Sequence, residues 1–108
     1  ASSTGPPTPD VVMRTVAQFF NLPVNSLTGK ARSKMVADAR HIAMYLLREE
    51  CQLSLKDIGR LLGGRDHSTV IHAVHKVELL MRTDPILRRQ VSEIRSLLSP
   101  GYTAQASA

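Results

Sequence analysis

The chain has 108 residues, 43% of them hydrophobic, which is enough for one compact domain with a modest core and too little for two. Its apolar runs fall far short of the ~20 residues that a membrane span needs, and its start, ASSTGPPTPD, lacks the charged and apolar regions of a signal peptide. Lysine and arginine number 14 against 9 acidic residues, a net charge of +5, which favours a polyanionic partner: nucleic acid or an acidic membrane surface.

The single cysteine, Cys51, cannot form a disulfide within the chain. The absence of an internal bridge favours a reducing compartment, so we expect a cytoplasmic protein.

Both flanks differ in composition from the middle of the chain. Residues 1–9, rich in Ser, Thr, Gly and Pro, predict a linker, and residues 99–108 predict a flexible tail. The folded domain is therefore expected to span residues 10–98.

The first predicted helix begins with Asp10 as its cap and ends before Asn21 and Pro23. Its apolar positions recur at helical spacing: Val12, Val16, Phe19 and Phe20. The next residues, VNSLTG, predict either a short turn of helix or a loop. Residues 29–34, GKARSK, predict a loop with three cations in five residues, Lys30, Arg32 and Lys34, and we expect this loop to project from the domain.

The longest predicted helix covers residues 33–50 and is amphipathic. Its buried stripe is expected to consist of Met35, Val36, Ala39, Ile42, Ala43, Leu46 and Leu47. On the opposite side Lys34, His41 and Arg48 lie seven residues apart, so they drift by only about 20° per step and form a basic row. Such a row suits a solvated surface, and it also suits contact with an anion.

Two further helices follow, at about 55–62 and 67–82. Ser54 is expected to cap the first, Gly63 and Gly64 to end it, and Asp66 to open the second, whose apolar stripe is Val70, Val74, Val77 and Met81. The pair has the dimensions of a helix-turn-helix. Gly59 supports this reading, because a mid-helix glycine costs ~1 kcal/mol relative to alanine and suggests a close backbone approach. A plain helical hairpin with a tolerated glycine is the alternative.

A last helix is predicted from Asp84 and Pro85 to Leu98. Its apolar positions are Ile86, Leu87, Val91, Ile94, Leu97 and Leu98. Since every predicted element is helical, the fold class is all-α.

The start of the second of the paired helices is crowded with polar side chains: Asp66, His67, Ser68 and Thr69. In a helix-turn-helix these residues enter the major groove, where base edges offer donors, acceptors and thymine methyls. Arg65, just before the helix, can reach phosphate. Helix capping by Asp66 is the alternative and needs no ligand, but capping does not require His67 and Ser68.

The sequence does not favour a catalytic function. The side chains of Asp66, His67 and Ser68 are consecutive and diverge, so they cannot form a nucleophilic triad. His72 and His75 could share a metal ion, but no further ligand pattern accompanies them. No phosphate-binding GxxxxGK[ST] motif is present. We therefore expect neither enzymatic activity nor a cofactor.

The run GGRDHSTVIHAVHK, with ARHIAMYLLREE and KARSK upstream, resembles the C-terminal DNA-binding domain of the bacterial replication initiator DnaA, over about residues 11–98. The resemblance implies an all-helical domain that binds double-stranded DNA at DnaA boxes similar to TTATCCACA during replication initiation. In that family the helix-turn-helix reads one half through the major groove, and a basic loop reads the A/T-rich half through the minor groove. ATP would be bound by a separate domain, and we expect the isolated domain to be a monomer. The resemblance also implies a protein associated with the nucleoid.

The resemblance also assigns residues. Asp66, His67, Ser68 and Thr69 match the major-groove readers, Ile71 a position near thymine methyls, and Arg32 the minor-groove arginine. At or near the implied contact surface lie Lys30, Lys34, Arg40, His41, Arg48, Lys56, Arg65, His72 and Lys76. Ser68 stands where many members have threonine, Ala31 where a basic residue is common, and Lys56 where some carry proline, which bears on affinity and on tolerance for imperfect boxes.

Two other functions fit the composition. A docking module for acidic phospholipid or a regulatory protein would use the basic surface, with Phe19 and Phe20 as an anchor, although their place on the apolar stripe favours the core. A non-specific DNA-binding protein would show steep salt dependence and no sequence preference.

Overall fold

A computed structural model describes residues 7–98 of the chain. Within this range the protein forms six α-helices and no strand, which confirms the all-α prediction. The helices are α1 (Pro9–Phe19), α2 (Val24–Thr28), α3 (Lys34–Glu50), α4 (Leu55–Leu61), α5 (His67–Thr83) and α6 (Pro85–Leu98). Residues 1–6 of the predicted linker and the whole predicted tail, 99–108, lie outside the described residues.

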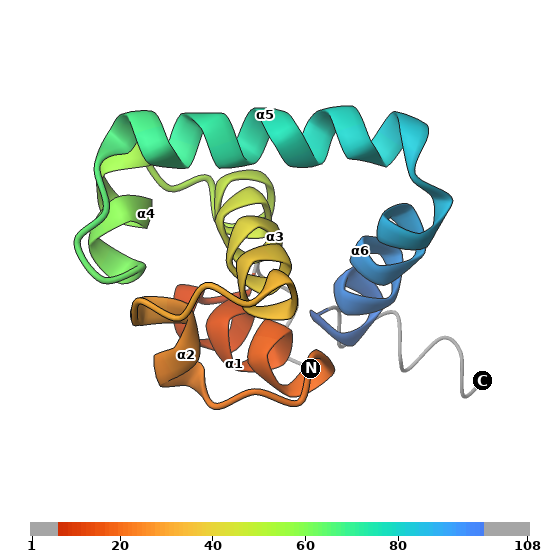
Figure 1. Ribbon diagram of the computed structural model, residues 1–108, viewed down its shortest axis with the longest axis horizontal. Coiled ribbons are helices and arrows are strands. Elements are labelled where there is room, and N and C mark those ends of the chain that lie inside the picture. Colours follow the sequence, from red (N-terminus) through yellow and green to blue (C-terminus); the bar gives the residue numbers. More distant parts are fainter. Residues whose placement is uncertain (1–6, 99–108) are drawn as a thin grey trace.

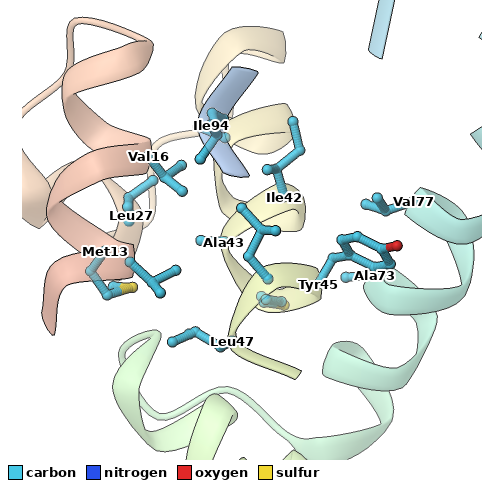
Figure 2. Close-up of a cluster of buried hydrophobic side chains, with 14 of the residues drawn as sticks. Met13, Val16, Leu27, Ile42, Ala43, Tyr45, Leu47, Ala73, Val77 and Ile94 are labelled. Carbon is cyan, nitrogen blue, oxygen red and sulfur yellow. The ribbon is translucent and has the colours of Figure 1, made fainter. Parts of the chain in front are cut away.

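Helix α3 is the centre of the fold. In Figure 1, α5 runs along the top, α3 lies beneath its middle, and α4 and α6 descend from its two ends. Helices α1, α2, α4 and α5 all pack against α3. Every residue from 42 to 47 of α3 is buried, and Figure 2 shows Tyr45 of α3 beside Ala73 and Val77 of α5. The core is therefore built around one helix that supports the helix-turn-helix formed by α4 and α5.

The helix caps agree with the sequence at two of the three predicted positions, Ser54 and Asp66, and Ser33 is a further cap, at the start of α3. The side chains of Ser33, Ser54 and Asp66 each accept a hydrogen bond from a backbone N–H in the first turn of α3, α4 and α5. The prediction for α1 is wrong, because Thr8, rather than Asp10, caps it. The cap and the first helical residue lie two positions earlier than expected, and the helix starts at Pro9, where proline is well suited because the first amides of a helix have no helical partner.

Some apolar positions predicted from helical spacing are exposed. Met35, assigned to the buried stripe of α3, is 53% exposed, and Ile86 and Leu97 of α6 are 70% and 63% exposed. All three lie in the first or last turn of a helix, where the helix extends past the elements that cover its middle. The stripe prediction is therefore wrong for Met35 and holds along the middle of α3.

Phe19 and Phe20 are partly buried and pack against the core, with their rings edge to face. The sequence favoured this placement over a role as a membrane anchor. None of the helices within residues 7–98 is both long enough and apolar enough to cross a bilayer.

Candidate nucleic-acid interface

The N-terminal turn of α5 presents its polar side chains to solvent: Asp66, His67, Ser68 and Thr69 are all exposed. Asp66 accepts hydrogen bonds from the hydroxyl and the backbone N–H of Ser68, and these two bonds lower the pKa of Asp66. The other carboxylate oxygen lies 3.7 Å from Nδ1 of His67. Asp66 is thus an ionised helix cap that still presents one oxygen at the surface, so capping and base contact are compatible.

The exposed face of α5 continues from this turn. Ser68, His72 and Lys76 follow one another at intervals of four residues and are exposed. Ile71 is 36% exposed beside them. His72 and His75 have no third ligand nearby, since residues 7–98 contain no group of three His, Cys, Asp or Glu side chains that could hold a metal ion. This face is polar and basic, with one apolar position close to the tip.

The basic loop, residues 29–33, connects α2 to α3. From residue 30 to 33 it has no regular structure, and all four of these residues, including Lys30 and Arg32, are exposed. Lys34 begins α3 and forms an ion pair with Asp38 at 3.0 Å. The predicted basic loop is exposed, but it ends at Ser33 rather than at Lys34, because Lys34 belongs to α3.

Arg40 holds this loop from beneath. It was predicted to lie at or near the contact surface, and it lies beneath the exposed loop, with only 9% of its area exposed. Its Nε donates to the carbonyl of Leu27 at 3.1 Å. Its Nη2 lies within hydrogen-bond distance of the carbonyls of Ser26, Gly29 and Ala31, at 3.2, 3.2 and 3.0 Å. Burial, followed by the nearby charge of Arg65, lowers the pKa of Arg40. Arg40 therefore stabilises the backbone of the basic loop.

Arg65, in the turn between α4 and α5, also bonds the backbone where the loop begins. It is half-buried, and its guanidinium donates to the carbonyl of Leu62 and, at 2.7 Å, to the carbonyl of Gly29. Only part of this side chain remains available for phosphate. The contact joins the turn between α4 and α5 to the basic loop, and it is a tertiary contact that the sequence pattern did not predict.

Glycines make the close approaches around this turn possible. A Cβ at Gly59 would overlap the carbonyl oxygen of Arg65, which confirms the close backbone approach predicted there. Gly63 has φ +90°, and a Cβ at this position would overlap the carbonyl oxygen of Thr28. Side chains at either position would push the turn away from its neighbours.

The predicted basic row on α3 is only partly exposed. Lys34 and Arg48 are exposed, and Arg48 donates to the carbonyl of Leu53 at 2.9 Å. His41 is half-buried, and burial is the main cause of its lowered pKa. The charges of Lys76 and Arg40 lower this pKa further, while Asp38 raises it. Lys56, in the first turn of α4, is exposed. The row is thus interrupted where α5 covers α3.

Known proteins share this sequence and architecture. Residues 9–77 match the model of the family described as the bacterial dnaA protein helix-turn-helix. Over 91 residues the chain is 47% identical to the chromosomal replication initiator protein DnaA of Roseiflexus castenholzii and 48% identical to that of Thermomicrobium roseum. These alignments cover 84% of this chain and 19% and 20% of the two relatives, so the chain spans about a fifth of their length.

A solved structure has the same fold. It is described as a crystal structure of a DNA replication initiation factor, is 32% identical to this chain and superposes with a TM-score of 0.70. The match covers 83% of this chain and 28% of the other. From its sequence, its helical architecture and its helix-turn-helix, the chain belongs to the bacterial DnaA helix-turn-helix family.

Proposed function

We propose that this domain binds double-stranded DNA at DnaA boxes similar to TTATCCACA and acts in the initiation of chromosomal replication. The tip of α5 enters the major groove, and the basic loop enters the adjacent minor groove over the A/T-rich half. The observation that carries this proposal is that two exposed elements rich in hydrogen-bonding and basic side chains are joined through Arg65 and Gly29. In Figure 1 the α2–α3 segment and the α4–α5 turn lie on the same side of the molecule.

The tip of α5 has the groups that major-groove recognition needs. The carboxylate of Asp66 accepts from the amino group of cytosine, and His67 and Thr69 donate to base acceptors. Ile71, partly exposed one turn further along, contacts a thymine methyl. The Asp66–Ser68 hydrogen bonds fix the carboxylate before DNA arrives, which reduces the entropy lost on binding.

The basic loop has the groups suited to a narrow minor groove. A/T-rich tracts concentrate negative potential there and attract arginine, so Arg32 inserts and Lys30 contacts the flanking backbone. Further phosphate contacts come from exposed residues on three helices: Lys34, Arg48, Lys56, His72 and Lys76. Arg40 is left out because it is buried, and Arg65 and His41 contribute less because both are half-buried. Binding of this kind needs no cofactor.

Fluorescence anisotropy tests the proposal. A labelled duplex carrying TTATCCACA and a scrambled duplex of the same composition are titrated at two salt concentrations. We expect the box to bind about 10³-fold more tightly than the scrambled duplex. His67→Ala and Asp66→Ala should each weaken box binding by roughly 5- to 150-fold and scrambled binding little. His75→Ala, on α5 but away from the tip, is the matched control.

Equal and strongly salt-dependent binding of both duplexes by the wild type would reduce the function to non-specific DNA contact. The phospholipid alternative relied on Phe19 and Phe20 as an anchor, and both pack against the core.

A further inference from the structure

The turn that leads into the tip of α5 contacts the chain at Thr28 and Gly29, where the basic loop begins. The carbonyl of Gly29 accepts from Nη2 of Arg40, on α3, at 3.2 Å and from Nη2 of Arg65, in the α4–α5 turn, at 2.7 Å. The neighbouring carbonyl, that of Thr28, lies so close to Gly63 that no side chain fits between them. The loop and the turn are therefore in direct contact, and two arginines, one from α3 and one from the turn, bond the same loop carbonyl.

These bonds restrict relative movement more than a single contact would. A guanidinium is planar and has five donors in a fixed fork, whereas a lysine ammonium is a point charge on a flexible stem. Arg65 uses its fork to bridge Leu62, at the end of α4, and Gly29, at the start of the loop. Because Arg65 also precedes the cap of α5 by one residue, this bridge ties the tip of α5 to the loop.

We infer that Arg65 and Gly63 are positioning residues that fix the separation of the basic loop and the α5 tip, so that the protein accepts the two halves of its DNA site at only one spacing. This inference rests on the proposed function. Arg65 acts here indirectly, because it holds Arg32 of the loop at a fixed distance from Asp66 and His67 of the tip.

A change in the DNA tests such a fixed separation. One base pair inserted between TTAT and CCACA moves the halves about 3.4 Å apart and rotates them by roughly 35°. A protein whose two elements are held at one separation can then engage only one half. If the elements moved independently, they would follow the displaced half and lose little affinity.

The experiment measures dissociation constants for the intact box and for the box with the inserted base pair. The readout is the ratio of the two constants, which does not depend on the folded fraction because both duplexes meet the same protein. Gly63→Ala separates turn and loop by the overlap with Thr28, and Arg65→Lys keeps the charge but loses the fork. Gly64→Ala is the matched control, since Gly64 also has a positive φ, +83°, and a Cβ there meets nothing within 4 Å.

We expect the wild type to bind the intact box at least about tenfold more tightly than the interrupted one. The ratio should fall at least about fivefold in Gly63→Ala and Arg65→Lys and stay at the wild-type value in Gly64→Ala. Circular dichroism verifies that each variant is folded, and Arg65→Lys carries the test if Gly63→Ala does not fold.

Three results would overturn the inference while leaving the proposed function intact. In the first, the wild type prefers the box but tolerates the insertion. In the second, the folded Gly63→Ala and Arg65→Lys variants keep the wild-type ratio. In the third, the ratio for Gly64→Ala falls as far as that for Gly63→Ala. A wild type that binds box and scrambled duplexes equally would instead overturn the proposed function itself.

Discussion

The tip of α5 and the basic loop present similar side chains to solvent, but they are held in place in different ways. The tip belongs to a helix, whose backbone hydrogen bonds are internal, and its cap, Asp66, comes from the adjacent residue. The loop has no such pattern, and side chains from elsewhere, Arg40 and Arg65, satisfy its carbonyls. The first element is specified by local sequence, and the second depends on the assembled fold.

Removing Arg40 should disrupt the support of the basic loop and produce the largest loss of stability. Arg40→Ala takes the arginine donor from the carbonyls of Ser26, Leu27 and Ala31 and leaves Gly29 with Arg65 alone, so we expect the free energy of unfolding to fall by about 2–4 kcal/mol. Urea denaturation measures the change. Arg48→Ala, which removes one bond at an exposed site, is the control and should cost less than about 1 kcal/mol. Equal losses from both variants would contradict the assigned role of Arg40.

Gly59→Ala tests whether the tip of α5 keeps its structure independently of the rest of the fold, as its local cap suggests. Helix propensity alone would stabilise the variant by ~1 kcal/mol. Because the new Cβ overlaps the carbonyl of Arg65, we expect a net destabilisation of about 1–3 kcal/mol in the same assay. Ser92→Ala, at an exposed position inside α6, should be neutral or slightly stabilising. A stabilised Gly59→Ala protein would show that the turn does not need this close approach.

Arg32→Ala changes the loop's exposed surface without touching its support. Arg32 is exposed, so stability should change by less than about 0.5 kcal/mol. Affinity for the intact box should fall roughly tenfold, because the minor-groove contact is lost. Anisotropy on boxes with an intact or scrambled A/T half measures the effect. An undiminished preference for the A/T half would remove Arg32 from the minor groove.

The smallest predicted effect concerns pH and the covered part of α3. The pKa of His41 is lower in the folded protein than in the unfolded chain, so at mildly acidic pH the unfolded chain binds more protons. The stabilisation from a neutral His41 is present above about pH 6.5 and is lost as pH falls below it. His41→Gln should therefore reduce the drop in the unfolding midpoint between pH 7.5 and 5.5, and His75→Gln should leave that drop as it is. If the drop in the unfolding midpoint were as large in His41→Gln as in the wild type, His41 would not be the source of this pH dependence.

The same contrast explains how much the sequence predicted. Most helix boundaries and two caps followed from local signals, since Ser54 and Asp66 act on amides two or three residues away. The exposed tip and the projecting loop were also predicted. The burial of Arg40 beneath the loop was not predicted. The carbonyls that it bonds come from 9 to 14 residues earlier in the chain, and helical spacing carries no information about them. The predicted burial of Met35 was wrong for a similar reason, because a periodic pattern does not show where a covering helix ends.

The central claim is that two differently supported elements read two halves of one site. The most direct measurement crosses Arg32→Ala and His67→Ala with duplexes in which either TTAT or CCACA is scrambled. Each variant should lose affinity only on duplexes that keep its own half intact: TTAT for Arg32→Ala and CCACA for His67→Ala. If both variants lose the same affinity on every duplex, the two elements do not divide the site between them, and the account is wrong.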